Sequence, residues 1–313
     1  MFVFYIIILA IGLYFLIAGA ELLVKKASLL ARQFHVHPFF VGVILLGMGT
    51  SAPEWAVSAI SSLKGLANLA VANVFGSNLF NILLVLGMIL LKPLSKTNIH
   101  LIKRDILFLV LSGFILIPLM WNYFLSRMDA FFLTLVFLIY IILSFFSARK
   151  RKPPSELIEI PNKRLPLLRE VLFIILGFGL LIGGSHLTVI GASYLGEELG
   201  MSERLIGILI VSVGTSLPEL FASLVAIVKG EKDIAVGNII GSNIFNTFAI
   251  LSTAAWIRPV PIDIKMFTID LPMLLFTHIL LLLIIFCYQF KWIQKTLPYI
   301  FFSGYICYLF LLW

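Results

Sequence analysis

The sequence predicts an all-α polytopic membrane protein with ten transmembrane helices, arranged as two inverted five-helix repeats. Three observations lead to this fold class: the apolar composition, the number of long apolar segments, and two polar motifs that recur at one interval. Of the 313 residues, 61% are hydrophobic and 12% are charged, and the mean hydropathy is +1.10. A soluble domain is about half apolar and a quarter charged, and a chain of this length cannot enclose the surplus in a core. The expected environment is therefore a bilayer, and disordered, fibrous and disulfide-stapled classes are excluded.

Ten apolar segments have the length that a membrane span requires, which is about 20 residues for a helix. They cover residues 2–24, 39–63, 68–91, 105–121, 129–147, 167–190, 205–228, 233–257, 267–288 and 297–313. The first segment has no basic residue before it and is too long for a signal-peptide core, so a retained helix is expected. Cys287 and Cys307 lie in apolar stretches and indicate packing, not a disulfide or a metal site.

The basic residues predict the orientation of these helices. Eighteen of the 23 Lys and Arg residues fall in alternate loops. Cytoplasmic loops carry an excess of basic residues, so both termini are expected outside, and the net charge of +8 reflects topology and not binding to nucleic acid. The polar segment 148–166 is predicted to be a short cytoplasmic linker between a first repeat, 1–147, and a second, 167–313.

An offset of 165 residues superposes the two halves of the chain without gaps over a long stretch. Internal repetition of this kind is sought before single motifs are interpreted. The matched motifs are Gly-Thr-Ser-x-Pro-Glu at 49–54 and 214–219, and Gly-Ser-Asn-x-Phe-Asn at 76–81 and 241–246. Each half holds five predicted helices, and an odd number makes the second half enter the membrane from the opposite side. Inverted repeats are a common plan for secondary transporters, with the substrate site where the repeats meet.

Two glutamates of the repeated motifs, Glu54 and Glu219, lie inside apolar segments. A charged carboxylate at the bilayer centre costs roughly 3 kcal/mol on insertion scales, so such residues usually face a polar cavity and have a function. The alternative is a protonated or hydrogen-bonded glutamate that only packs. A glutamate occurs at the equivalent position of both repeats, and this duplication favours a functional role.

A proline directly precedes each glutamate. Pro53 and Pro218 each remove a helical donor and displace the carbonyl one turn earlier, which belongs to Gly49 or Gly214. Irregular backbone in a membrane is tolerated where it lines a cavity, and carbonyls beside a carboxylate suit Ca²⁺ and Na⁺. A simple packing kink is the alternative. The threonines in the same two turns are Thr50 and Thr215.

Small polar residues of the motifs add neutral oxygen ligands. Those singled out are Ser51, Ser77, Ser216, Ser242, Asn81 and Asn246. Ser77 and Asn81 are one helical turn apart and share a face, as do Ser242 and Asn246. The alternative for each residue is a polar contact that holds helices together.

These motifs resemble the α-repeats of the cation/calcium exchanger superfamily, in particular the sodium/calcium exchanger family. The resemblance covers nearly the whole chain, and the short linker is similar to that of prokaryotic members. It implies that Glu54 and Glu219 bind Ca²⁺ together with the backbone carbonyls of Thr50 and Thr215. It also implies sodium sites built from the same glutamates, the four motif serines, and carbonyls at Gly47 and Ser212.

Asn81 and Asn246 occupy two pseudo-symmetric polar positions of that family. Aspartate there is associated with potassium-dependent exchange, so the amides argue against potassium co-transport. Ala72 is a departure, since Gly237 at the equivalent position follows the usual Gly-Asn pattern, and we expect it to affect packing more than ligands. No cofactor is implied, since Ca²⁺ and Na⁺ are the transported substrates. The oligomeric state stays open, and a monomer is compatible with the sequence.

The function implied by the resemblance is secondary active antiport of Na⁺ against Ca²⁺, electrogenic and by alternating access. The first and sixth helices are expected to move, with tight contacts at Gly12, Gly19, Gly177, Gly179, Gly183 and Gly184. A prokaryotic plasma (inner) membrane is expected, because no targeting segment or large loop is recognised. The main alternative is a proton-coupled Ca²⁺/cation antiporter. A channel fits the inverted repeats less well, and no protease or hydrolase motif indicates an enzyme.

Overall fold

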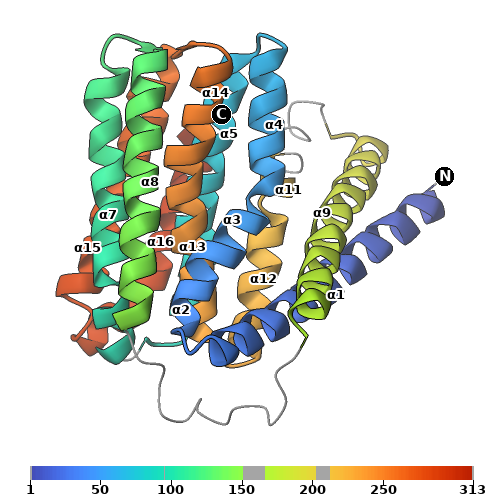
Figure 1. Ribbon diagram of the computed structural model, residues 1–313. Coiled ribbons are helices and arrows are strands. Elements are labelled where there is room, and N and C mark those ends of the chain that lie inside the picture. The colour runs from blue at the N-terminus through green and yellow to red at the C-terminus, as the bar shows by residue number, and fades with distance from the viewer. Residues whose placement is uncertain (1, 95, 151–165, 202–211, 312–313) are drawn as a thin grey trace. The chain divides into compact units, whose positions relative to one another are not determined.

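The computed structural model describes residues 2–94, 96–150, 166–201 and 212–311, and these are helical nearly throughout (Figure 1). The first repeat contains α1 (Phe2–Gln33), α2 (Pro38–Val41), η1 (Gly42–Leu46), α3 (Gly47–Thr50), α4 (Ala52–Leu63), α5 (Ala67–Leu79), η2 (Phe80–Leu86), α6 (Gly87–Leu90), α7 (Lys96–Met120), β1 (Phe124–Leu125) and α8 (Arg127–Lys150). The second contains α9 (Leu167–Glu198), α11 (Ser212–Gly214), α12 (Leu217–Val228), α13 (Lys232–Phe245), η5 (Asn246–Ile250), α14 (Leu251–Ile257), β2 (Val260–Pro261), η6 (Met266–Asp270), α15 (Leu271–Phe286) and α16 (Lys291–Leu311). The elements named η are segments of wide, π-type helix.

Six helices in the described part of the chain are long and apolar enough to cross a membrane, or seven if a bent pair counts as one span. They are Phe2–Gln33, Ala67–Leu90, Arg127–Ala148, Leu167–Glu198, Lys232–Ile257, Met266–Phe286 and the pair Pro38–Thr50 with Ala52–Leu63. Of the other predicted spans, 105–121 lies in α7 and 297–313 overlaps α16. The span predicted at 205–228 continues as α12, but 202–211 lie outside the described residues. The chain is thus an all-helical membrane protein, and the full number of ten spans stays a prediction.

The chain forms two compact units, and neither coincides with a sequence repeat. The first unit combines Met1–Pro53 with Ser147–Asn238, and the second combines Glu54–Phe146 with Ile239–Trp313. Each unit therefore takes segments from both repeats. The predicted linker begins inside α8, which continues to Lys150, and residues 151–165 lie outside the described part of the chain.

In the first unit, α1 and α9 lie side by side and run antiparallel (Figure 1). Glycines allow their backbones to approach closely. A Cβ atom at Gly19 would lie 2.8 Å from the Gly177 carbonyl oxygen, and one at Gly12 would lie 2.9 Å from that of Gly184. A larger residue at these places would force the two helices apart.

Two of the predicted contact glycines do not take part. A Cβ atom at Gly179 or Gly183 meets no described atom within 4 Å, so the prediction for these two positions is wrong. Both lie on another side of α9, because residues two or six positions from Gly177 do not share its helical face. Toward the C-terminal end of α1, an ion pair also joins α1 to α9, with 2.7 Å between Lys26 Nζ and Glu170 Oε2.

The second unit is a helical bundle that includes α5, α7, α8, α14, α15 and α16 (Figure 1). A two-residue antiparallel ladder joins β1 to β2, with Phe124 opposite Pro261. Asp105, the first residue of the predicted span 105–121, lies inside α7, where it accepts a hydrogen bond of 3.0 Å from the Tyr140 hydroxyl. Asp270 directly precedes α15 and accepts one of 2.9 Å from Tyr308. Both carboxylates therefore connect neighbouring helices of the bundle.

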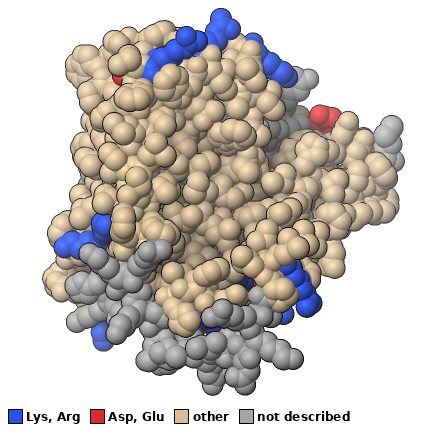
Figure 2. Space-filling view, in the orientation of Figure 1, with Lys and Arg blue, Asp and Glu red and all other residues tan. Residues whose placement is uncertain are grey.

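The surface agrees with a bilayer environment. On the face shown in Figure 2, lysine and arginine side chains gather toward the ends of the helices, with a broad uncharged surface between them. Large apolar side chains are exposed along α8, among them Phe131, Leu138 and Phe146. Lipid tails are the solvent that such a surface favours.

Candidate functional site

Both glutamate motifs lie where a helix is broken. Ser51 separates α3 from α4 with φ −81° and ψ 9°, and Ser216 precedes α12 with φ −92° and ψ 5°. The two halves of the first broken helix are bent by 41°. Pro53 and Pro218 stand in the first turn of the second half, where no amide hydrogen is needed. The prolines thus fix the break, as predicted, and each following glutamate lies in the first turn of a helix, where negative charge is favoured.

The carbonyl of Gly214, four residues before Pro218, receives a side-chain donor in place of a helical one. The Ser185 hydroxyl on α9 donates a hydrogen bond to it. The residue that corresponds to Ser185 in the first repeat is Ala20, which has no hydroxyl. The two broken turns are therefore satisfied in different ways.

The first unit holds the cluster of Glu219, which we define as Glu219, Ser51, Thr50, Asn238 and Ser223. The Glu219 side chain is fully buried, and its Oε1 accepts a hydrogen bond of 2.8 Å from the Ser51 hydroxyl. The Asn238 amide nitrogen donates to the Glu219 carbonyl at 3.3 Å and to the Ser223 hydroxyl at 3.0 Å. The Thr50 hydroxyl lies within donor distance of two acceptors, the Leu46 carbonyl at 2.9 Å and Asn238 Oδ1 at 3.1 Å. The broken turn of the first motif is thereby joined to the glutamate of the second.

The second unit holds the equivalent cluster of Glu54, which we define as Glu54, Ser77, Asn73 and Ser58. Glu54 is also fully buried, and Ser77 donates to its Oε1 at the longer distance of 3.4 Å. The Asn73 amide nitrogen donates to the Glu54 carbonyl at 3.2 Å and to the Ser58 hydroxyl at 3.0 Å. The same asparagine clamp on a glutamate carbonyl thus occurs in both units.

The clamp residues were not predicted as site residues. Asn73 and Asn238 are related by the 165-residue offset, and so are Ser58 and Ser223. That offset was the signal that could have identified them, since a polar residue repeated inside two apolar segments is unlikely to be incidental. The two asparagines donate to the backbone carbonyls of the glutamates and to the two serines, so these contacts connect the helices that carry the carboxylates to the helices that carry the asparagines.

Asn81 and Asn246, the paired amides of the second motif, are both in the second unit and fully buried. Asn246 Nδ2 donates to Asn78 Oδ1 at 3.1 Å, and Asn78 Nδ2 donates to the Thr247 hydroxyl oxygen at 2.9 Å. Neither amide atom of Asn81 has a hydrogen-bond partner among the described residues. Both asparagines lie at or in a π-type segment, η2 or η5. Such wide turns are frequent at functional sites.

Of the remaining predicted residues, Gly47, Ser212, Thr215 and Ser216 lie in the segments at the two helix breaks, and Ser242 lies inside a helix. Gly47 begins α3 and is buried, while Thr215 and Ser216 form the turn before α12. Ser242 lies in α13 and is buried. The backbone of Ser212 begins α11, and its side chain lies outside the described part of the chain.

Each unit therefore presents a fully buried motif glutamate with hydroxyl, amide and backbone oxygens around it. These are hard oxygen ligands, which suit Ca²⁺ and Na⁺. A charged carboxylate inside a membrane helix costs free energy, so such residues usually face a polar cavity and have a function. The fold and these clusters define a class, the polytopic membrane transporters for cations.

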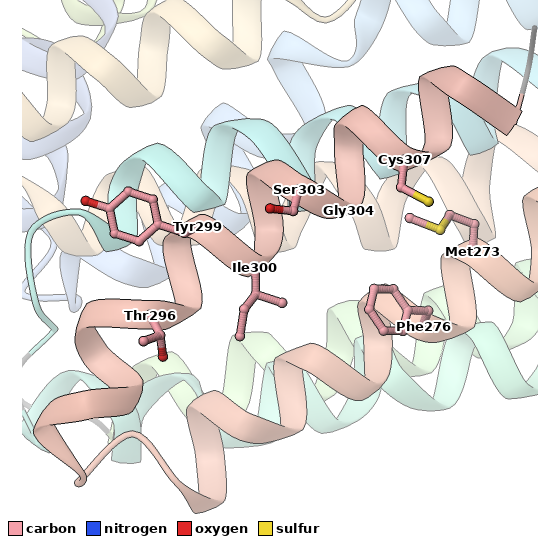
Figure 3. Close-up of a pocket in the computed structure, with 8 residues that line it drawn as sticks. All are labelled: Met273, Phe276, Thr296, Tyr299, Ile300, Ser303, Gly304 and Cys307. Atoms are coloured by element: carbon pink, nitrogen blue, oxygen red, sulfur yellow. The ribbon is translucent and has the colours of Figure 1, made fainter.

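A separate cavity of about 650 Å³ lies along α15 and α16 in the second unit (Figure 3). Met273 and Phe276 of α15 face it from one side, and Ile300, Gly304 and Cys307 line it from α16. None of the predicted site residues lines it. Its mostly apolar walls do not offer the ligands that a cation requires.

Comparison with known proteins identifies the family. The profile of the sodium/calcium exchanger proteins matches this chain twice, over residues 4–146 and 169–313. The chain belongs to the sodium/calcium exchanger protein family. It is accordingly a transporter and not an enzyme.

Individual relatives cover most of the chain. CaxA of Alkalimonas amylolytica, a candidate antiporter, is 38% identical over 263 residues, 82% of each chain. The inner membrane protein YrbG of Escherichia coli is 34% identical over 287 residues, 88% of this chain and 87% of YrbG. A structure of the archaeal sodium-calcium exchanger NCX_Mj soaked with zero Na⁺ and Ca²⁺ matches with a TM-score of 0.82 and 26% identity over the whole of both chains. One soaked with Na⁺ and Sr²⁺ matches with a TM-score of 0.81 and 26% identity, over 99% of this chain and 98% of that chain.

Proposed function

We propose that this protein is a secondary active antiporter that exchanges Na⁺ for Ca²⁺ by alternating access, electrogenically and without potassium. The observation that carries the proposal is the duplicated glutamate cluster, one in each unit, with a buried carboxylate and a serine donor in both. The family and the similarity to NCX_Mj, which is named as a sodium-calcium exchanger, support the choice of ions.

The charge balance supports exchange of these two cations. Glu54 and Glu219 together supply two negative charges, which one Ca²⁺ neutralises. We assign the Ca²⁺ ligands to these carboxylates and to the carbonyls of Thr50 and Thr215. Several Na⁺ ions would use the same carboxylates with Ser51, Ser77, Ser216 and Ser242, together with Gly47, Ser212, Asn81 and Asn246. Because the two ions share oxygens, they compete, and net charge moves when three or more Na⁺ replace one Ca²⁺.

The proposed topology is two inverted repeats of five spans with both termini outside. The three spans beyond the seven candidates would be α7, α16 and the segment that ends with α12. The excess of basic residues in alternate loops supports the orientation. YrbG, an inner membrane protein, supports a prokaryotic inner membrane as the location.

In this proposal α1 and α9 move together as one body. Their glycine-lined contact and the Lys26–Glu170 ion pair hold them to each other. The Ser185 hydroxyl joins α9 to the broken turn at Gly214. A displacement of α9 would therefore also displace the turn that precedes Glu219.

The test is ⁴⁵Ca²⁺ uptake into Na⁺-loaded proteoliposomes after dilution into Na⁺-free buffer. Wild-type protein should take up Ca²⁺ only when Na⁺ is inside, and an inside-negative membrane potential should change the rate. Glu54→Gln and Glu219→Gln should each abolish uptake, because each removes one of the two charges that balance Ca²⁺. Glu198→Gln is the matched control, since Glu198 is an exposed glutamate at the end of α9.

Three outcomes would overturn the proposal. Uptake driven by a pH gradient and indifferent to Na⁺ would establish the proton-coupled alternative. Retained exchange in either glutamine variant would remove that glutamate from the site. No gradient-driven Ca²⁺ flux from folded wild-type protein would show that the substrate is another cation.

A further inference from the structure

A short chain of hydrogen bonds fixes the orientation of the Asn246 amide. Asn78 Nδ2 donates to the Thr247 hydroxyl oxygen at 2.9 Å, so Asn78 Oδ1 is left to accept from Asn246 Nδ2, at 3.1 Å. All three residues are fully buried. Asn246 therefore turns its Oδ1 away from Asn78, and this oxygen has no hydrogen-bond partner among the described residues.

The first repeat lacks the equivalent arrangement. At the 165-residue offset, Asn81 corresponds to Asn246, Asn243 to Asn78 and Ile82 to Thr247. Ile82 has no hydroxyl to accept from Asn243. The Asn243 amide nitrogen instead donates to the Ile239 carbonyl of its own helix at 2.7 Å, and neither amide atom of Asn81 has a hydrogen-bond partner in the described chain.

A buried amide oxygen without a partner is costly, and such groups in native proteins call for an explanation. A bound cation supplies one, since an amide oxygen is an ordinary ligand for Na⁺ and Ca²⁺. A ligand that is already held in its binding orientation also avoids the loss of freedom on binding. The Asn246 oxygen has no partner among the described residues and its side chain is held by Asn78, so it meets both conditions. The Asn81 amide makes no hydrogen bond to the described residues, so nothing there fixes its orientation.

We propose that Asn78 and Thr247 are positioning residues that hold the Asn246 side chain so that its Oδ1 serves as a preoriented cation ligand. The inference rests on the proposed function and extends it: the two pseudo-symmetric amides are unequal, and the presence of threonine at 247 and isoleucine at 82 makes them so. Thr247 and Asn78 touch no cation themselves and act through Asn246.

The test is cation binding to the purified full-length protein, by calorimetric titration with Ca²⁺ and with Na⁺, for three variants. Thr247→Val keeps the shape but removes the hydroxyl, so Asn78 and Asn246 lose their fixed orientation. Thr247→Ser keeps the hydroxyl. Thr277→Val is the matched control, because Thr277 is fully buried in the same unit and its hydroxyl donates within its own helix, to the Leu274 carbonyl.

We expect Thr247→Val to raise the dissociation constant of at least one of the two cations about fivefold, the size of one neutral hydrogen bond. Thr247→Ser should restore the wild-type value, and Thr277→Val should match the wild type. Asn78→Ala should weaken binding similarly, and the Asn78→Ala/Thr247→Val double variant should be no weaker than the more affected single variant, since both act through one amide.

The inference is overturned if Thr247→Val binds both cations as the wild type does, or if Thr247→Ser is impaired as strongly as Thr247→Val. Loss of thermal stability in Thr247→Val with unchanged dissociation constants would also overturn it, since that pattern indicates structural support alone. The proposed function is tested separately by uptake. If the wild-type protein binds Ca²⁺ and Na⁺ without exchanging them, the proposed exchange is refuted, and the comparison of dissociation constants still tests the positioning role. If the wild-type protein binds neither cation, the exchange and the positioning role are both refuted.

Discussion

The hydrogen bond from Ser51 to Glu219 gives a quantitative prediction. The Ser51→Ala change removes the donor that lies 2.8 Å from Glu219 Oε1 and leaves the shape of the turn unaltered. A hydrogen bond to a charged group contributes about 1.5–3 kcal/mol, and every 1.4 kcal/mol is tenfold in an equilibrium constant. We therefore expect the apparent affinity for Ca²⁺ to fall at least about tenfold, because Glu219 is no longer held in position.

Ser77→Ala provides the comparison within the same molecule. Ser77 lies 3.4 Å from Glu54 Oε1, which is longer than the usual range for a hydroxyl donor. Its removal should weaken Ca²⁺ binding less than that of Ser51, by under about fivefold, the equivalent of one neutral bond. Ser112→Ala serves as the control, since the buried Ser112 hydroxyl donates to the Leu109 carbonyl of its own helix.

The assay is the Ca²⁺ dependence of ⁴⁵Ca²⁺ uptake at a fixed Na⁺ gradient, analysed for KM and maximal rate separately. The expected order of KM is Ser51→Ala above Ser77→Ala, with Ser112→Ala equal to the wild type. The reasoning is refuted if Ser51→Ala stays within twofold of the wild type, or if Ser77→Ala is the more impaired variant.

Three further predictions concern stability. Each of the changes Asn238→Ala and Asn73→Ala removes two amide donor bonds, at about 1 kcal/mol each. Asn238→Ala should lower the thermal denaturation temperature slightly more, because Asn238 Oδ1 also shares the Thr50 hydroxyl with the Leu46 carbonyl; equal losses would show that the Thr50 contact contributes nothing. Gly19→Ala should lower the denaturation temperature by several degrees through a backbone clash, whereas Gly183→Ala, which meets open space, should not; a loss in both would point to helix geometry and not to the α1–α9 contact. Ca²⁺ at about 100 times its Kd should stabilise the wild type by about 2.7 kcal/mol and leave Glu54→Gln unaffected, as followed by thermal melting in detergent; stabilisation of that variant would place Ca²⁺ elsewhere.

Much of the fold could be predicted because the bilayer imposes simple rules. Apolar runs of the required length identified the long helices, and the prolines before Glu54 and Glu219 identified the helix breaks at Ser51 and Ser216. Helix boundaries were less accurate. The apolar span predicted to begin at residue 105 belongs to α7, which begins at Lys96, because the polar residues from Lys96 onward continue the helix and do not form a loop.

The grouping of helices into compact units could not be predicted from the repeats. Sequence repetition records which segments are equivalent, whereas the compact units depend on which side chains pack together. The glycines in the sequence likewise do not show which of them face a neighbouring helix. The sequence could not separate Gly177, where a Cβ atom would meet Leu23 and the Gly19 carbonyl, from Gly183, where a Cβ atom would meet no described atom within 4 Å.

The chemical types of the site residues followed from the motifs, but their supporting contacts did not. Glu219 and Ser51 come from different repeats, and their hydrogen bond depends on tertiary packing. Asn73 and Asn238 were recognisable by the 165-residue offset, yet their binding to glutamate carbonyls required the structure. The unequal roles of Asn81 and Asn246 depend on one neighbour, Ile82 or Thr247, whose importance appears only once Asn78 and Asn243 are placed.

The central claim is that Ca²⁺ and Na⁺ compete for the same two glutamates. The most direct measurement is equilibrium binding of ⁴⁵Ca²⁺ to the purified protein at a series of Na⁺ concentrations, for the wild type, Glu54→Gln and Glu219→Gln. Na⁺ should raise the apparent Kd for Ca²⁺ steeply without changing the number of bound ions at saturation, and both variants should lose Ca²⁺ binding. Na⁺ that lowers the number of sites without changing Kd, or a variant that binds Ca²⁺ as the wild type does, would contradict it.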